Sequence, residues 1–311
     1  MARTPAKRAV DWLSDRLWRG LLAVLRRLPY ARRVRAGGWL WARVLGPIAG
    51  YTARADANLA RIWPGMEPAR RRRLARGALD NAGRTLLELY SGDELKARLA
   101  GTEPRGPGLA ALRDAQARRR PVILVTGHFG NYAAAWTVLR QAGFEIGGFY
   151  RPMANPWFDS HYAREMERHG GPIFRQDKRG TAGLMRHLRG GGMAVILLDQ
   201  HRGRGAMLDF LGVPAATTTE PAAIARRLGA LIVPFYGIRG ETGVDFDVIV
   251  EAPLPDGPPT EVMAAFNRSL GDRVRAHPAQ WFWPHRRWKS TERRLSADAP
   301  RPEPRPAPPP G

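Results

Sequence analysis

Three segments of the chain place polar side chains where a buried strand is predicted to end. TGHFGN contains His128, YRP contains Arg151, and LDQHR contains Asp199. In open α/β sheets, ligands bind outside the carboxyl ends of the strands. If the three strands are neighbours, these side chains face one crevice, and that crevice is the predicted site.

His128 is the residue best suited to act as a general base. An imidazole has the pKa needed to take a proton from an alcohol near neutral pH. Gly127 and Gly130 would allow a tight strand-to-helix turn and close approach of a substrate, and both are predicted to contact it. Backbone amides at the start of a helix over 130–142 could stabilise a developing oxyanion. The competing interpretation is a buried histidine bonded to the backbone.

Four further residues are candidates for the same crevice. Arg151 could hold a phosphate or another anion through its guanidinium group, or be an ordinary surface arginine. Asp199 could orient the base or pair with Arg151, and its alternative is an aspartate that opens a loop. Asn131 and Gln200 lie beside His128 and Asp199 in the sequence and are predicted to bind substrate.

The elements needed to position these residues predict an α/β fold with a mainly parallel central sheet. From about residue 108 the chain alternates helices and strands, a pattern that covers both faces of the sheet with helices. The expected strands are 121–126, 146–150, 193–198, 231–236 and 244–250, with the last two paired. The expected helices are 108–119, 130–142, 156–169, 180–189, 218–229 and 260–276.

The amino-terminal segment is predicted to form a basic amphipathic helix over 8–28. Leucine and valine recur at helical spacing among arginines, and Trp12 and Trp18 add aromatic bulk. The pattern suits a helix in a membrane interface, and it also suits a helix packed on the domain. The tryptophan and arginine content favours the membrane.

A bilayer-spanning helix is not expected. The most apolar stretch, 36–53, contains Arg43 and Pro47, whereas a span needs about 20 mostly apolar residues. We therefore divide the chain into a helical membrane-associating region over 1–50, an α/β domain over 51–289, and a proline-rich disordered tail over 290–311. The first two parts include helices expected over 33–62 and from residue 67 onward.

The charge balance points to anionic partners. The 311 residues carry a net charge of +22, almost all of it from arginine. Such a surface attracts nucleic acids, acidic lipid headgroups or acidic proteins. No zinc-finger or RNA-binding signature is present, which disfavours nucleic acid. The absence of cysteine excludes disulfides, thiolate metal sites and a cysteine nucleophile.

The carboxyl-terminal motif WFWPHRRW concentrates aromatic and basic residues. Trp281, Trp283 and Trp288 could pack an edge of the sheet or form an interfacial girdle near lipid. We favour packing, with Arg286 and Arg287 available to acidic partners.

Together these segments carry a family resemblance. GHFGN, YRPMANPWFD, QDKRG, LLDQHRGRGAMLDFLGVPAATTT and HPAQWFWPHRRWK occur in order, and NLARIWPGM and DNAGRT precede them. Over about 51–289 the chain resembles the lipid A biosynthesis late acyltransferases, the lauroyl/myristoyl transferase family, with a lysophospholipid-acyltransferase-like fold. The order and spacing of the motifs carry this resemblance, since each motif alone is weak.

The resemblance implies an activity and a location. Enzymes of this family move a fatty acyl chain from acyl carrier protein to a hydroxyl of a lipid A precursor, at the cytoplasmic face of the inner membrane. They use no metal or redox cofactor. The family's histidine matches His128, and the arginine of its YRP motif matches Arg151. An anionic membrane surface is the partner expected for the amino-terminal helix.

The chain departs from the family pattern at one position. The family has Asp or Glu five residues after its histidine, and this chain has Ala133 there, with no acid before Glu145. The carboxylate normally orients the imidazole and stabilises its protonated form. Either Asp199 takes over this task, which we favour, or the protein is a catalytically degenerate relative that still binds lipid or acyl carrier protein.

Overall fold

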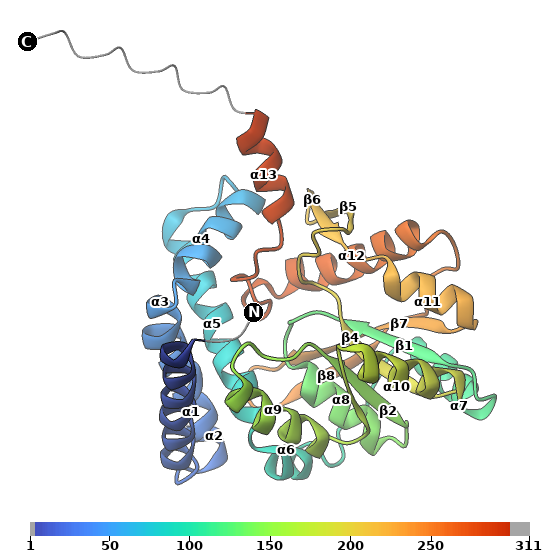
Figure 1. The fold of residues 1–311 in the computed structure, drawn as a ribbon, viewed down its shortest axis with the longest axis horizontal. Coiled ribbons are helices and arrows are strands. Elements are labelled where there is room, and N and C mark those ends of the chain that lie inside the picture. Colours follow the sequence, from blue (N-terminus) through green and yellow to red (C-terminus); the bar gives the residue numbers. More distant parts are fainter. Residues whose placement is uncertain (1–3, 299–311) are drawn as a thin grey trace, which may run out of the picture.

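A six-stranded sheet forms the centre of the α/β part of the molecule (Figure 1). The computed structural model describes residues 4–298. The strand order is β3-β2-β4-β1-β7-β8, and only β8 runs antiparallel to its neighbour, β7. The strands are β1 (Val122–Thr126), β2 (Ile146–Tyr150), β3 (Ile173–Arg175), β4 (Met193–Leu197), β7 (Leu231–Arg239) and β8 (Phe246–Val250). The predicted mainly parallel sheet is confirmed.

Helices cover both faces of the sheet because its buried strands send alternate side chains to two apolar clusters. Val122 and Leu124 join one cluster, which includes residues of α7, α8 and α9, whereas Ile123 and Val125 join a cluster with residues of α10, α11 and α12. These helices are α7 (Gly108–Ala117), α8 (Tyr132–Gln141), α9 (Pro156–Arg168), α10 (Lys178–Arg189), α11 (Glu220–Leu228) and α12 (Pro259–Ala276).

Several elements of the fold were not expected from the sequence. Among them are the edge strand β3, the short helix α6 (Gly92–Arg98), and a separate hairpin of β5 (Ala206–Phe210) and β6 (Val213–Thr217). The hairpin turns through Leu211 and Gly212, whose φ angles are 60° and 88°. Two consecutive residues with positive φ give the tight turn that matches the twist of the strands.

The helical region expected over 33–62 is broken into several pieces. It consists of α2 (Tyr30–Leu40), a π-helical turn over Trp41–Leu45, α3 (Gly46–Ile48) and α4 (Tyr51–Ile62). Pro47 lacks the N–H that a continuous helix requires, and Gly50 adopts a left-handed φ of 69° before α4 begins. The next helix is α5 (Pro68–Leu89), which begins within one residue of the expected start and is capped by the Glu67 carboxylate. Within residues 4–298, no helix combines the length and apolar character needed to cross a membrane.

The first helix, α1 (Pro5–Leu25), packs on the domain through a partly polar face. Asp15 is buried and accepts a hydrogen bond from His161 of α9, with Oδ1 2.8 Å from Nε2. His161 Nδ1 lies 2.7 Å from the Tyr90 hydroxyl. Another face of the helix leaves apolar side chains in solvent, namely Val10, Trp12, Leu13, Leu17 and Val24.

The carboxyl-terminal tryptophans are core residues. Trp281, Trp283 and Trp288 are fully buried, which confirms the packing interpretation. The structure differs from expectation just after them, because Lys289–Asp298 forms helix α13 where the extended tail was expected to begin. The rest of that tail, residues 299–311, lies outside the described residues.

Candidate active site

The sheet register brings His128 and Asp199 together. Thr126 of β1 pairs with Leu197 of β4. His128 lies two positions after Thr126, and Asp199 lies two positions after Leu197. β2 lies on the other side of β4 and delivers Arg151. The prediction that the three strands are neighbours is therefore confirmed.

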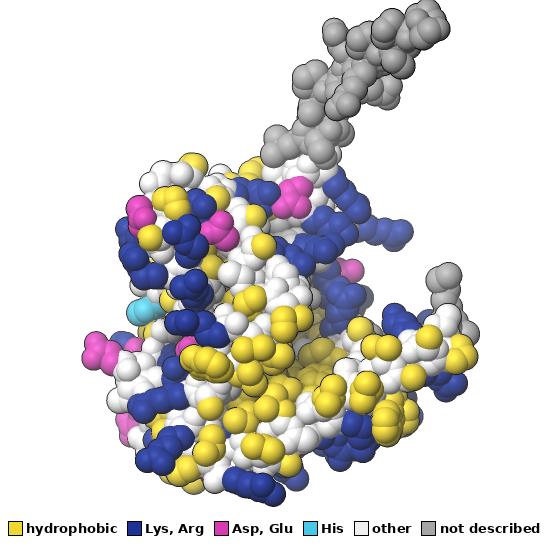
Figure 2. Space-filling model, turned by 90° about the vertical axis from the view of Figure 1, so that its left-hand side faces the viewer, with side chains coloured by type: hydrophobic (Ala, Val, Ile, Leu, Met, Phe, Trp, Pro, Cys, Tyr) yellow, Lys and Arg dark blue, Asp and Glu magenta, His cyan; other side chains and the backbone are white. Residues whose placement is uncertain are grey.

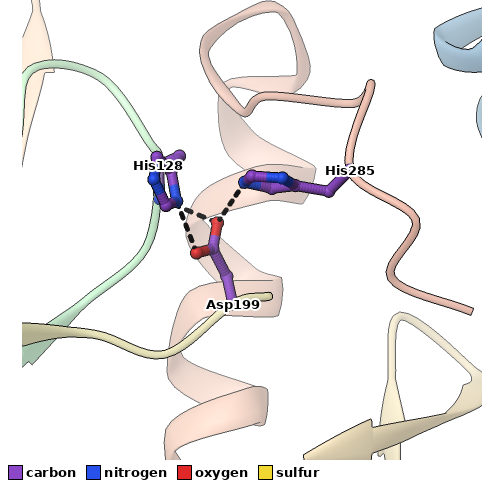
Figure 3. A group of neighbouring side chains, drawn as sticks. All are labelled: His128, Asp199 and His285. Carbon is purple, nitrogen blue, oxygen red and sulfur yellow. Dashed lines mark hydrogen bonds and ion pairs between the residues drawn. The ribbon is translucent and has the colours of Figure 1, made fainter. Parts of the chain in front are cut away.

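His128 and Asp199 form a closely bonded pair (Figure 3). Nδ1 of the imidazole lies 2.7 Å from Asp199 Oδ1, and the backbone N–H of His128 donates to Oδ2 at 2.7 Å. Trp281 donates its indole N–H to the same Oδ2 at 2.9 Å. The carboxylate is fully buried, whereas the imidazole side chain is 30% exposed. This arrangement holds the ring by one nitrogen and leaves the other available.

His285 completes the cluster, and sequence reasoning did not place it there. Its Nε2 lies 3.6 Å from Asp199 Oδ2, and its ring centroid is 4.5 Å from that of His128, edge to face. In Figure 3 the two imidazoles approach the carboxylate from either side. The HRRW motif signalled basic and aromatic character at this position, but only the fold brings position 285 beside β4.

Burial and charge set the protonation of this cluster. Burial by itself would raise the pKa of Asp199, but the charges of His128 and His285 and the hydrogen bonds from His128 outweigh it and lower that pKa. Burial lowers the pKa of His285 to about 3, with the nearby cations adding to the effect and Asp199 opposing it. At neutral pH the site therefore contains an ionised Asp199 and a neutral His285.

Two cavities open from His128. The first, of about 660 Å³, is the helical cavity, lined by α4, α5 and the carboxyl-terminal loop through Tyr51, Ala78, Thr85, Phe282 and His285. The second, of about 450 Å³, is the strand cavity, lined through Phe149, Tyr150, Met166, Ile196 and Leu198. His128, Tyr132 and Gln200 line both cavities. A reaction at His128 could thus join groups that arrive from two directions.

The predicted binding residues fall into two groups. Gln200 lines both cavities, Gly130 lines the helical cavity, and the exposed Arg151 lines the strand cavity. Gly127 packs closely on the cluster, since a β-carbon there would lie 3.0 Å from Asp199 Oδ2. The side chain of Asn131 is fully buried and caps α8, with its Oδ1 accepting from Ala134 N at 3.0 Å. Asn131 lines neither cavity, so its side chain holds the start of α8 instead of contacting a substrate.

Two of the amides expected to form an oxyanion site, those of Gly130 and Asn131, already have backbone partners. Gly130 N–H donates to Gln280 O at 2.9 Å, and Asn131 N–H donates to Gly237 O of β7 at 2.8 Å. Gly130 has a φ of 54°, and a β-carbon there would collide with Gly237 O. The two amides therefore fix the loop against Gln280 and β7 and are not free to face an oxyanion.

A buried ion pair anchors that loop from below. Arg239 of β7 binds Glu88 of α5 through two nitrogens, at 2.5 and 2.7 Å. Glu88 accepts from Asn131 Nδ2 at 2.7 Å, and Asn81 and Thr85 both donate to Gly130 O at 3.0 Å. The DNAGRT motif supplies the last two residues. Its role is to fix the loop that carries His128.

Ala133 has no direct part in the cluster. It lies in the first turn of α8, is buried, and belongs to the apolar cluster on one face of the sheet. Glu145, the next acid in the sequence, is exposed beyond that helix. Asp199 therefore occupies the place beside the imidazole, as expected if it replaces the missing acid.

The same three residues could offer ligands to a metal. One atom each from His128, Asp199 and His285 lies within 4.8 Å of the others. His128 and Asp199 are bonded to each other, whereas His285 Nε2 has no hydrogen-bond partner within the described residues. We derive no chemistry from a metal.

Comparisons with known proteins identify the family of the chain. A family described as bacterial lipid A biosynthesis acyltransferase matches residues 3–290. Lipid A biosynthesis lauroyltransferase of Escherichia coli (strain K12) is 27% identical over 279 residues, which cover 87% of this chain and 90% of the relative. Lipid A biosynthesis acyltransferase of Haemophilus influenzae (strain ATCC 51907 / DSM 11121 / KW20 / Rd) is 26% identical over 180 residues, 57% of this chain and 56% of the relative. The chain therefore belongs to the bacterial lipid A biosynthesis acyltransferases, a family that implies acyl transfer onto a lipid A precursor.

Proposed function

We propose that this protein transfers a fatty acyl chain from acyl carrier protein to a hydroxyl of a lipid A precursor, with His128 as general base. The observation that carries the proposal is the 2.7 Å contact between His128 Nδ1 and a buried, ionised Asp199, at the junction of two cavities. A carboxylate bound to Nδ1 favours the tautomer that has its proton on Nδ1. Nε2 is then the basic nitrogen.

The chemistry follows from this tautomer. Nε2 of His128 takes the proton of the acceptor hydroxyl as its oxygen attacks the thioester carbonyl. The tetrahedral intermediate collapses, the carbon–sulfur bond breaks, and the imidazolium returns the proton to the departing thiolate. Asp199 stabilises the imidazolium between these steps. The products are an ester and the free thiol of the carrier, and no other reactant is needed.

Both cavities combine apolar side chains with polar ones. The strand cavity is lined by Phe149, Met166, Ile196 and Leu198, and also by Arg151, Gln176 and Arg202. The helical cavity is lined by Trp41, Leu86, Leu89 and Phe282, and also by Asn81, Thr85 and Arg286. Each cavity therefore offers apolar surface that can bury part of an acyl chain and polar groups that can bind a sugar.

The inner membrane is the proposed location, with the molecule lying on its cytoplasmic face. Figure 2 shows hydrophobic side chains on α1 and around a hollow beside it, with Lys and Arg side chains nearby. Trp39, Ile48 and Trp157 are exposed in addition to the apolar residues of α1. Apolar side chains flanked by cations suit an interface with anionic lipid.

The direct test supplies acyl carrier protein loaded with a fatty acid and a lipid A precursor with a free hydroxyl. Mass spectrometry should show one acyl chain added by the wild-type protein and none by His128→Ala. In cells, loss of the protein should remove one acyl-chain mass from lipid A. The alternative, a degenerate relative that binds lipid or carrier without turnover, is favoured if the purified wild-type protein binds both substrates and transfers nothing.

A further inference from the structure

Basic side chains gather where the helical cavity opens. Arg54 of α4, Arg286 and Lys289 all line this cavity. The same three residues line an adjoining hollow of about 280 Å³, together with Asn58, Glu292 and Arg293. Figure 2 shows Lys and Arg side chains on the wall of the hollow below α13. The cations therefore face the cavity that leads to His128.

The backbone beneath these cations is fixed. Asn58 Nδ2 donates to the carbonyl oxygens of Trp283 and His285, at 2.8 and 2.9 Å, which holds the turn before Arg286. Arg54 Nη1 lies 3.4 Å from Pro284 O, and its guanidinium carbon lies 5.5 Å from the centre of the Tyr51 ring. A ligand would meet groups that are already in position, which lowers the entropic cost of binding.

The positive charge of this cluster is poorly neutralised. Within the described part of the chain, no salt bridge joins a carboxylate to Arg54, Arg286 or Lys289. The nearby acid, Glu292, forms an ion pair with Arg61 at 2.8 Å. The positive charge also affects His201, which lines the same cavity. Burial lowers the pKa of His201, and the charge of Lys289 lowers it further.

We propose that Arg54, Arg286 and Lys289 form a subsite for a phosphate group of one of the two substrates of acyl transfer. The inference rests on the proposed function, since it assumes that the helical cavity receives a substrate. Two arginines and a lysine around a hollow match the charge and the hydrogen-bond acceptors of a phosphate. The phosphate could be a monoester on the acceptor sugar or the phosphodiester of the carrier's pantetheine arm. The subsite is set into a hollow continuous with the reaction cavity, which favours a substrate phosphate over a flat membrane surface.

The test measures binding directly, so that it does not depend on turnover. Glucosamine 1-phosphate and 4′-phosphopantetheine are titrated calorimetrically into the full-length protein, each beside its phosphate-free counterpart. The variants are Arg54→Gln and the double variant Arg286→Gln/Lys289→Gln. Arg189→Gln, an exposed arginine at the end of α10, is the matched control for loss of charge. Thermal melts establish that each variant is folded.

The expected result is that one phosphorylated probe binds at least tenfold more tightly than its counterpart. The double variant should abolish that preference, Arg54→Gln should weaken it, and the control should retain it. The probe that shows the preference identifies the substrate that carries the phosphate. The KM for that substrate should rise in the same variants while kcat changes little.

Two results would overturn the proposal. One is that neither phosphorylated probe is preferred by the wild-type protein. The other is that the double variant keeps the preference but loses binding to phosphatidylglycerol vesicles, which would assign the cations to the membrane. Failure of acyl transfer with intact phosphate binding would instead reject the proposed function and leave the subsite standing.

Discussion

Within residues 4–298, two buried aspartates pair with histidines, and the two pairs differ in what surrounds the imidazole. In the pair of His128 and Asp199 the ring is partly exposed and lines two cavities. In the pair of His161 and Asp15 the ring is enclosed, with its second nitrogen bound to the Tyr90 hydroxyl. Their histidine–aspartate distances, 2.7 and 2.8 Å, are almost the same. Access to the second nitrogen, rather than the pair itself, distinguishes the proposed reactive site from a structural contact.

The largest predicted effect is at the accessible pair. His128→Ala should lower kcat for acyl transfer by about 10³-fold or more, because burial lowers the pKa of the neighbouring His285 to about 3 and makes that imidazole a much weaker base. The measurement is the initial rate of transfer from acyl-loaded carrier protein. Near wild-type turnover by a folded variant would remove His128 from the mechanism.

Asp199→Asn should cost about 10²-fold or more in kcat, with a smaller effect on KM. The asparagine side chain keeps the shape of the aspartate but carries no charge, so it no longer stabilises the imidazolium. If its nitrogen faces Nδ1, the ring proton moves to Nε2 and the base is lost. NMR of the imidazole nitrogens would report the tautomer. An unchanged tautomer and rate would mean that Asp199 is not the substitute acid.

Ala133→Asp tests the degenerate interpretation. Position 133 is buried among apolar residues, and His128 Nδ1 already has a carboxylate partner. We expect this substitution to lower the free energy of unfolding by roughly 3 kcal/mol or more and to leave kcat no higher than in the wild type. Urea unfolding and the transfer assay provide the two readouts, with Ala133→Ser as the milder control. A gain of activity would show that the wild-type site lacks its acid.

Acidification should lower the free energy of unfolding through His285. This histidine lies beside the pair of His128 and Asp199 and not beside the enclosed pair. Its pKa is lowered from 6.5 to about 3 by burial, so the unfolded chain binds a proton that the folded chain does not. Stability should therefore fall as the pH drops from about 6.5 toward 3, with a slope of up to about 1.4 kcal/mol per pH unit from this group. His285→Gln should make the slope shallower. An unchanged slope would contradict the lowered pKa.

The smallest effect on catalysis is expected at the enclosed pair. His161→Gln removes the bond to Asp15 that ties α1 to α9 and leaves His128 untouched. We expect kcat to change by less than about twofold, while amide hydrogen exchange in α1 becomes faster. A large loss of kcat with unchanged exchange would make the two pairs functionally alike.

The pair of His128 and Asp199 was predicted from the sequence because each residue follows the end of a predicted apolar strand. The parallel sheet was also predicted, since β1 and β4 read as continuous apolar runs. The β5–β6 hairpin escaped prediction because Pro214 and the LG turn resemble a loop and because it stands outside the main sheet.

Other parts of the site depend on tertiary contacts that local patterns do not report. His285 and Trp281 reach Asp199 from a loop more than 80 positions later in the chain. Asn131 was predicted to bind substrate because it follows His128 closely, yet its Nδ2 donates to Glu88 and its Oδ1 caps the start of α8. The sequence pattern predicted that α1 has an apolar side. The contact between Asp15 and His161 orients the helix and so determines which of its residues face solvent.

The register of β1 and β4 has a consequence for how relatives are classified. Two neighbouring parallel strands can place an acid and a base side by side at their carboxyl ends, however far apart the strands are in the sequence. A mutation that erases the acid encoded near the histidine then need not silence the protein. Surveys that require both residues within one short motif would discard such a chain as inactive, whereas a comparison of strand ends would retain it.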